Sequence, residues 1–163
     1  MSNDQIVDPL RSRKMLDHRG PLSIDVSNAI YFITIAASER GGTALSDHAS
    51  AILRSARYYQ SAGKWFLYLF LVMPDHLHML VHVPTTLVLA DVISSWKHYL
   101  AHAEGVAFQR DFFDTRIRDE KHFQAKWNYI CRNPVARGLV KSPRDWPHII
   151  AFDPKTGVER EHR

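Results

Sequence analysis

The sequence predicts an α+β protein in which a ferredoxin-like antiparallel sheet has its helices packed on one face. The main observation is the order of the apolar segments, which read as strand, helix, strand, strand, helix and then further elements. The composition agrees, since 45% hydrophobic and 23% charged residues in a chain of 163 are typical of one globular domain. We expect this domain over residues 23–150, between a polar N-terminal arm at 1–22 and a C-terminal tail at 151–163.

The first half of the domain is predicted to hold one helix between two strands. Residues 29–38 are β-branched and aromatic and are followed by Gly41 and Gly42, which indicates a strand and a turn. Residues 46–63 place apolar side chains at helical spacing between a capping serine and a glycine, so we expect a helix. Residues 64–73 are apolar on both faces, as is typical of a strand in the middle of a sheet.

The second half continues with one strand and two helices. Residues 76–84 follow a Pro-Asp turn and are predicted to form the next strand. Helical spacing recurs over residues 89–105 and again over residues 119–133. Between these helices, residues 112–117 are read as a short strand or an extended link.

Charge and hydropathy narrow the class of protein. The longest apolar run, residues 65–74, is half of the roughly 20 residues that a membrane helix needs, and the polar start lacks a signal-peptide centre, so we expect a cytoplasmic protein without membrane contact. The single Cys131 excludes an internal disulfide and a cysteine-based zinc site. Residues 110–144 hold nine Lys or Arg against four acids, which is compatible either with a polyanion partner or with a solvated surface.

Three histidines recur at alternate positions of the predicted strand 76–84. Alternation places one mixed set and one apolar set on opposite faces. The sets are His76, His78, Leu80 and His82 against Leu77, Met79, Val81 and Val83. We expect the apolar set to face the helices and the histidines to lie together on the open face of the sheet, unburied. They are then either solvated imidazoles or two ligands of a metal site whose third ligand comes from another element.

Two further groups compete for a role at such a site. Asp75 is adjacent to His76, but we read it as a turn residue on the wrong face. His98 and His102 are spaced i, i+4 on a predicted helix, yet no Glu follows the first of them, so the metalloprotease signature is absent. This pair is read as surface, with a zinc hydrolase as the alternative.

The predicted helix 119–133 has two distinct faces. Its apolar stripe and the neighbouring polar face each recur at helical spacing. They consist of Phe123, Trp127, Ile130 and Pro134, and of His122, Lys126, Tyr129 and Asn133, respectively. Tyr129 therefore lies off the core stripe, either as an amphipathic residue with a wet hydroxyl or as a functional phenol. Asn133 precedes Pro134, so it is either the cap of the next turn or an amide ligand.

Two motifs in combination form a specific family signature: "MPDHLHML" (73–80) and "WNYICRNPVARGLV" (127–140). With "SWKHYLAH", "FFDTRIRDEKHF" and "SPRDWPHI", they make residues 28–148 resemble the single-tyrosine transposases with a histidine–hydrophobic–histidine motif, and among these the REP-associated tyrosine transposases. The resemblance implies a ferredoxin-like nuclease that cuts single-stranded DNA beside a hairpin and holds the cut 5′ end as a phosphotyrosine.

The resemblance also implies roles for four residues. His76 and His78 become metal ligands, Tyr129 the nucleophile, and Asn133 the third ligand, where related enzymes often have Gln. A phenol with a pKa near 10 needs help to attack a phosphodiester at pH 7, and a divalent ion, Mg²⁺ or Mn²⁺, supplies it. Because all three ligands are neutral, the ion keeps its full charge, and imidazole ligands favour Mn²⁺ at least as much as Mg²⁺.

The expected partner is single-stranded or hairpin DNA, bound by a monomer or a homodimer. Candidate phosphate contacts are Lys97, Arg116, Arg118, Lys126 and Arg137. Trp96 is read either as a stacking platform or as a core residue. Two alternatives stay open at this point: Tyr99 as a rival nucleophile, and a catalytically silent regulator that binds hairpins on the same fold.

Overall fold

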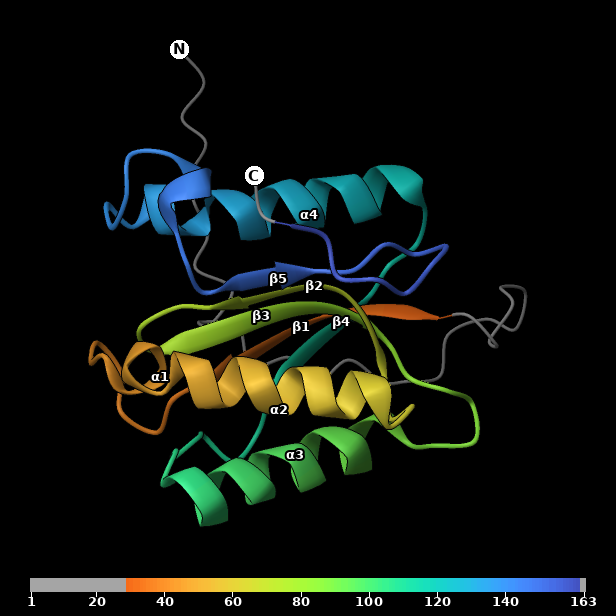
Figure 1. The fold of residues 1–163 in the computed structure, drawn as a ribbon, viewed down its shortest axis with the longest axis horizontal. Helices are drawn as coiled ribbons and strands as arrows, with labels where there is room; N and C mark the ends of the chain where they lie inside the picture. Colours follow the sequence, from red (N-terminus) through yellow and green to blue (C-terminus); the bar gives the residue numbers. More distant parts are fainter. Residues whose placement is uncertain (1–28, 162–163) are drawn as a thin grey trace.

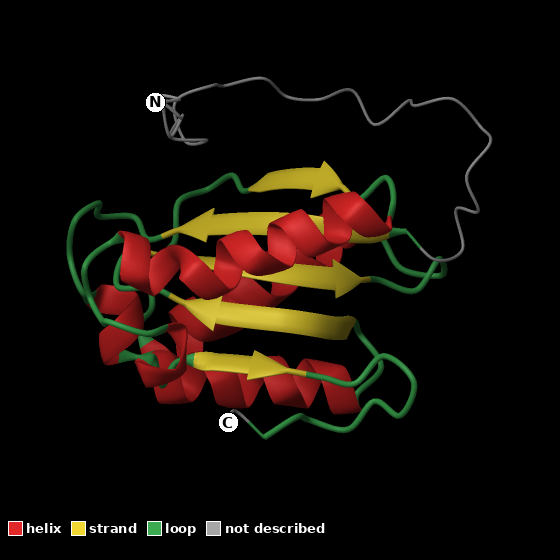
Figure 2. Cartoon of the chain, turned by 90° about the horizontal axis from the view of Figure 1, so that it is seen from above, coloured by secondary structure: helices red, strands yellow, loops and turns green. Residues whose placement is uncertain are grey.

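The protein is a five-stranded antiparallel sheet with helices on both sides, as seen in a computed structural model that describes residues 29–161. The strand order is β4-β1-β3-β2-β5, and Figure 2 shows the strands side by side. Their bounds are Ile30–Ala36 (β1), Phe66–Val72 (β2), His76–His82 (β3), Phe113–Arg116 (β4) and Ile149–Ala151 (β5). The predicted α+β antiparallel fold is confirmed, whereas the predicted arm at 1–22 lies outside the described residues.

The strands differ from the prediction mainly at the edges of the sheet. Three long apolar runs form β1, β2 and β3 close to the expected bounds, and the segment 112–117 is a true strand, β4, paired with β1. The edge strand β5 was not predicted, because three residues are too short to show a periodicity. It spans the expected domain boundary at residue 150, so Ala151 and the buried Phe152 belong to the packed body.

The helices begin and end largely for local reasons. They are Ala44–Asp47 (α1), Ala49–Ser61 (α2), Leu89–Glu104 (α3) and Glu120–Ala136 (α4), with a 3-10 turn at Pro143–Asp145. The single helix predicted at 46–63 is interrupted at His48, whose φ of −107° and ψ of 16° are not helical. Gly105, with a φ of 69°, ends α3 in the left-handed conformation that glycine tolerates best. The Asp119 carboxylate caps α4 by accepting the backbone N–H of His122.

The helix α4 runs through Pro134 instead of stopping at Asn133 as predicted. Proline removes one hydrogen-bond donor from the helix. The helix nevertheless continues, because the Arg137 N–H donates to the Asn133 carbonyl oxygen and because Ile130, Asn133 and Pro134 are buried against the sheet. Tertiary packing therefore outweighs the local preference for a break.

The helices form two layers, not one. Figure 1 shows α2 and α3 below the sheet and α4 above it, so the expected packing on a single face is wrong in this detail. The physical reason is that β1, β2 and β3 each place apolar side chains on both faces of the sheet. Phe32, Leu71 and Leu80 cluster with Ile130 of α4, while Ile33, Leu77 and Val81 and their neighbours pack in the cluster that includes residues of α2 and α3.

The segment that follows β5 folds back on the body. Phe152 pairs with Glu159 in an isolated β-bridge. The Glu159 carboxylate accepts two hydrogen bonds from the Arg57 guanidinium of α2, both of 2.8 Å. Among residues 29–161, no helix combines the length and the apolar character needed to cross a membrane.

Candidate functional site

The histidines of β3 lie under α4, not on an open face. The predicted alternation is correct, since Leu77, Met79 and Val81 belong to the core cluster with α2 and α3. The opposite face of β3 was expected to be exposed, but His76 and His78 are only 3% and 1% exposed. Because α4 covers this face, the two imidazoles are buried, with ring centroids 4.7 Å apart.

His76 is oriented by Asp75. The Nδ1 atom of His76 lies 2.8 Å from Oδ1 of Asp75, and the other carboxylate oxygen accepts the backbone N–H of Gly41 at 3.0 Å. Asp75 lies in the turn before β3, as expected, but the prediction that it is on the wrong face is incorrect, because strand alternation does not apply to a residue in the turn. With its Nδ1 proton donated to a carboxylate, His76 carries its lone pair on Nε2, as metal-binding histidines do.

His78 is held from two other elements. Its Nδ1 lies 2.8 Å from the Thr34 hydroxyl of β1, directly across the strand pair, and its Nε2 lies 3.3 Å from Nδ2 of Asn133 on α4. The tautomer that satisfies both contacts has its proton on Nδ1 and its lone pair on Nε2. The Nε2 lone pairs of both imidazoles therefore lie on the ring side opposite Asp75 and Thr34, and that of His78 accepts from the Asn133 amide.

Asn133 supplies an unused oxygen at the same place. Its side chain is 7% exposed, and Oδ1 is buried without a hydrogen-bond partner in the described part of the chain. A buried amide oxygen left unpaired is costly, so it marks a position that a ligand would complete. Two imidazole nitrogens and an amide oxygen make a neutral donor set that suits a divalent transition metal such as Mn²⁺.

The surface histidines on α3 do not make a comparable site. The rings of His98 and His102 stack at a centroid distance of 5.2 Å. Within residues 29–161, however, no group of three or more His, Cys, Asp or Glu is arranged to hold a metal ion. The zinc-hydrolase reading therefore lacks a third ligand of these types in the described part of the chain.

The buried imidazoles are neutral at physiological pH. Burial lowers the pKa of His78 well below its ordinary value, and the positive charges of Lys126 and Arg137 lower it further. Burial also lowers the pKa of His76, against the opposing effect of Asp75. Neutral imidazole is the form that binds a metal.

Tyr129 lies beside these histidines. It is on α4, one turn before Asn133, and its side chain is 37% exposed. Its ring makes edge contacts with His78 and Phe32, at centroid distances of 5.4 and 6.0 Å. The rival Tyr99 is on α3, in the layer on the other side of the sheet (Figure 1). One chain thus brings a phenol of α4 and two imidazoles of β3 together across the interior.

The predicted phosphate contacts divide between the two layers. Lys126 and Arg137 lie near the histidines, since both charges act on His78, while Arg118 is exposed just before α4. Arg116 pairs with Tyr31 across β1 and β4, so by alternation it faces the α2 and α3 layer.

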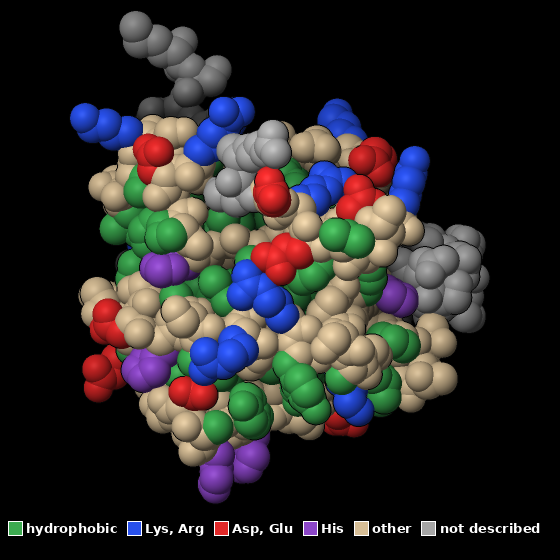
Figure 3. All heavy atoms as spheres, in the orientation of Figure 1, with side chains coloured by type: hydrophobic (Ala, Val, Ile, Leu, Met, Phe, Trp, Pro, Cys, Tyr) green, Lys and Arg blue, Asp and Glu red, His purple; other side chains and the backbone are tan. Residues whose placement is uncertain are grey.

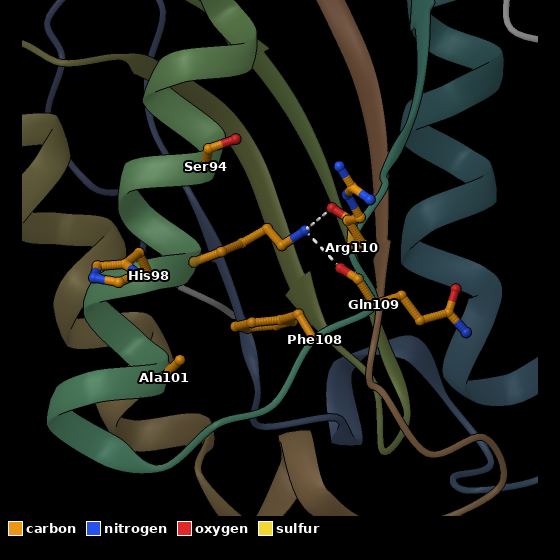
Figure 4. Close-up of a pocket in the computed structure, with 7 residues that line it drawn as sticks. Ser94, His98, Ala101, Phe108, Gln109 and Arg110 are labelled. Atoms are coloured by element: carbon orange, nitrogen blue, oxygen red, sulfur yellow. Dashed lines mark hydrogen bonds between the residues drawn. The ribbon is translucent and has the colours of Figure 1, made fainter.

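Lys97 and Trp96 make structural contacts within the α2 and α3 layer. The Lys97 ammonium donates to the backbone carbonyls of Gln109 and Arg110, at 2.6 and 2.8 Å, at a hollow of about 260 Å³ between α3 and residues 108–110 (Figure 4). Trp96 is fully buried and donates its indole N–H to Ser55. The stacking role considered for Trp96 is therefore excluded, and its core reading is correct.

Arg40 is a charged residue near the site that the sequence did not reveal. It precedes Gly41, whose N–H binds Asp75, and its positive charge lowers the pKa of His76. The segment 39–42 was read only as a turn, and no periodicity connects it to β3. The hydrogen bond from Gly41 to Asp75, together with the pairing of Ala36 with His76, brings this loop to the histidines.

Comparison with known proteins gives two relatives that carry the same description. The REP-associated tyrosine transposase of Escherichia coli strain K12 is 35% identical over 81 residues, which cover 47% of this chain and 48% of that protein. The alignment thus spans about half the length of that relative. A Haemophilus influenzae protein, provisionally given the same name, is 24% identical over 136 residues, which cover 73% of this chain and 77% of its own length.

The fold has a solved counterpart. A structure described as a REP-associated tyrosine transposase bound to a REP hairpin matches with a TM-score of 0.70 at 22% identity, over 80% of this chain and 81% of that one. The family model described as "Transposase IS200 like" matches residues 25–130, a span that includes His76, His78 and Tyr129. Because this span is well over half of the chain, the protein belongs to the IS200-like transposase family.

Proposed function

We propose that this transposase cuts and rejoins single-stranded DNA beside a hairpin, with Tyr129 as the nucleophile. The observation that supports this most strongly is the convergence of Tyr129 and Asn133 of α4 on His76 and His78 of β3. A phenol, two neutral imidazoles and an unpaired amide oxygen are the groups that metal-assisted transfer of a phosphodiester requires.

In the proposed reaction, the Tyr129 oxygen attacks the scissile phosphorus and loses its proton. The bond between phosphorus and the 3′ oxygen breaks, and the leaving oxygen takes up a proton to become a 3′ hydroxyl. The 5′ end stays bound as a phosphotyrosine, so its bond energy is conserved and a later attack by a 3′ hydroxyl rejoins DNA without ATP. This chemistry is transfer, not simple hydrolysis.

His76, His78 and Asn133 would hold a divalent ion, Mg²⁺ or Mn²⁺. Enzymes of this family are generally metal-dependent. A bound ion supplies positive charge at the phosphate and stabilises the leaving oxygen. The chain itself keeps these ligands ready: Asp75 and Thr34 set the tautomer and direction of each imidazole, and burial keeps both imidazoles neutral.

The substrate follows from the exposed charge and from the relatives. The solved counterpart is described as bound to a REP hairpin, which supports hairpin DNA as the substrate class. Figure 3 shows Lys and Arg side chains on the visible face, several of them over the α4 layer and mixed with acidic side chains. We assign phosphate contacts to Arg118, Lys126 and Arg137 and leave out Lys97 and Arg116, which belong to the other layer.

A single chain suffices for this site. Tyr129 contacts His78 of its own chain, with ring centroids 5.4 Å apart, so no tyrosine from a second subunit is needed. Of the two expected states, monomer and homodimer, the geometry therefore supports catalysis within a monomer.

The test is the formation of a covalent adduct. Labelled hairpin DNA with a single-stranded flank is incubated with the full chain and Mn²⁺, and the products are separated under denaturing conditions. We expect an adduct with the wild type and with Tyr99→Phe, and at least a thousandfold less with Tyr129→Phe. Hairpin binding without any adduct would instead support the catalytically silent regulator.

A further inference from the structure

Lys126 lies half-buried beside the proposed nucleophile. It lies on α4, three residues before Tyr129, so the two side chains share a helix face. Its Nζ lies 4.5 Å from the centroid of the Phe32 ring and 5.8 Å from that of Tyr129. The Phe32 ring also stacks on His78 at 5.4 Å, so one buried ring joins the lysine, the phenol and the imidazole.

The charge of Lys126 has no carboxylate to balance it among residues 29–161. The ion pairs described there join other residues, and Asp75, the carboxylate beside the histidines, is bound to His76 and Gly41. Burial lowers the pKa of Lys126, as expected for an ammonium that has lost part of its water. Cation–π contacts with two rings offset part of this cost. A half-buried cation without a paired carboxylate is a feature that a bound anion would complete.

We propose that Lys126 is a catalytic residue whose ammonium contacts the phosphate attacked by Tyr129. It stabilises the negative charge there while the bond from phosphorus to the tyrosine oxygen forms and the bond to the 3′ oxygen breaks. Lys126 keeps its own protons, and the phenol proton and the 3′ hydroxyl proton exchange with water. This inference rests on the proposed function and adds a specific charge to it.

The position of Lys126 distinguishes it from a general DNA contact. Lys121 is on the same helix but is exposed, so water screens its charge. Lys126 is half-buried among rings, where an electrostatic contact is stronger than in water. A fixed charge in such a place acts on the reacting phosphate more than on the affinity for DNA as a whole.

The experiment separates rate from affinity with three variants. Lys126→Met keeps the length of the side chain and removes the charge, Lys126→Arg restores a cation, and Lys121→Met is the matched control on α4. Two quantities are measured on the same hairpin DNA: the single-turnover rate of adduct formation at saturating protein with Mn²⁺, and the dissociation constant without metal. We expect Lys126→Met to lower the rate about 100-fold while the dissociation constant changes by less than about threefold. Lys126→Arg should react at least about tenfold faster than Lys126→Met, and Lys121→Met should react like the wild type.

Four outcomes would overturn the inference. If Lys126→Met reacts at the wild-type rate, or if rate and affinity fall together, Lys126 is not catalytic. If Lys126→Arg fails while its thermal unfolding matches that of the wild type, charge is not what Lys126 supplies. Should the wild type form no adduct at all, the proposed function fails with the inference, whereas a wild-type adduct with an indifferent Lys126 removes the inference alone.

Discussion

One face of the sheet carries most of the hydrophobic core, and the other carries the candidate site. The face under α2 and α3 belongs to a cluster of 23 buried hydrophobic residues, whereas the face under α4 belongs to a cluster of eight. Four buried polar residues, Thr34, His76, His78 and Asn133, lie on the second face, whereas the first face holds the buried Ser55, which accepts the indole N–H of Trp96. One strand, β3, serves both, because its alternate residues point in opposite directions. The polar atoms of the candidate site thus lie beside the smaller apolar cluster.

The largest effect on stability is expected from the α2 and α3 face. Leu77→Ala removes a fully buried side chain of β3 and should lower the free energy of unfolding by about 2–5 kcal/mol. Leu139→Ala, the same change at a leucine that is 43% exposed, should stay within about 0.5 kcal/mol. Urea unfolding measures both. A loss below about 1 kcal/mol for Leu77→Ala would mean that this face does not dominate stability.

The α4 face should gain stability from a metal instead. At a Mn²⁺ concentration 100 times its dissociation constant, the wild type should be stabilised by about 2.7 kcal/mol relative to protein in chelator. Asn133→Ala should lose most of this gain, because it removes one of three proposed donors, while His98→Ala on α3 should keep it. Each variant is compared with itself in chelator, so its own change in stability cancels. An equal gain in Asn133→Ala would refute the ligand set.

A smaller effect, on the affinity for Mn²⁺, is expected from the Asp75 carboxylate that is hydrogen-bonded to His76. Asp75→Ala should weaken Mn²⁺ binding about tenfold, or about 1.4 kcal/mol, because His76 loses the group that holds its Nδ1 proton. Asp75→Asn keeps one acceptor oxygen and should lose less. Calorimetric titration with Mn²⁺ measures the affinities. Unchanged binding in Asp75→Ala would show that the turn, not the carboxylate, orients the imidazole.

The smallest effect concerns the ion pair that holds the C-terminal segment. Arg57→Gln breaks a two-bond contact with Glu159 whose side chains are 46% and 37% exposed, so unfolding should become easier by only about 0.2–1 kcal/mol. The more exposed Arg54, 3.6 Å from Glu104, is the control and should contribute less. Thermal unfolding at low and high salt would detect the difference. A cost above about 2 kcal/mol would mean that the segment after β5 stabilises the α2 and α3 face as much as a core residue does.

The sequence by itself determined the features that depend on neighbouring residues. The alternation in 76–82 separated the histidines from the core residues, and helical spacing placed Tyr129 and Asn133 on one side of 119–133. Both follow from the fixed periods of strand and helix. The motif pair also identified the family, which the family model then confirmed.

Tertiary structure alone decided how these parts meet. The packing of α4 on the histidine face, the burial of His78 and the approach of Asn133 join positions that are 55 residues apart. The bridge from Asp75 to Gly41 and the continuation of α4 through Pro134 depend on similar contacts. The local periodicity of the sequence does not encode these contacts. An apolar stripe shows that a helix packs on a sheet, but not on which of the two faces.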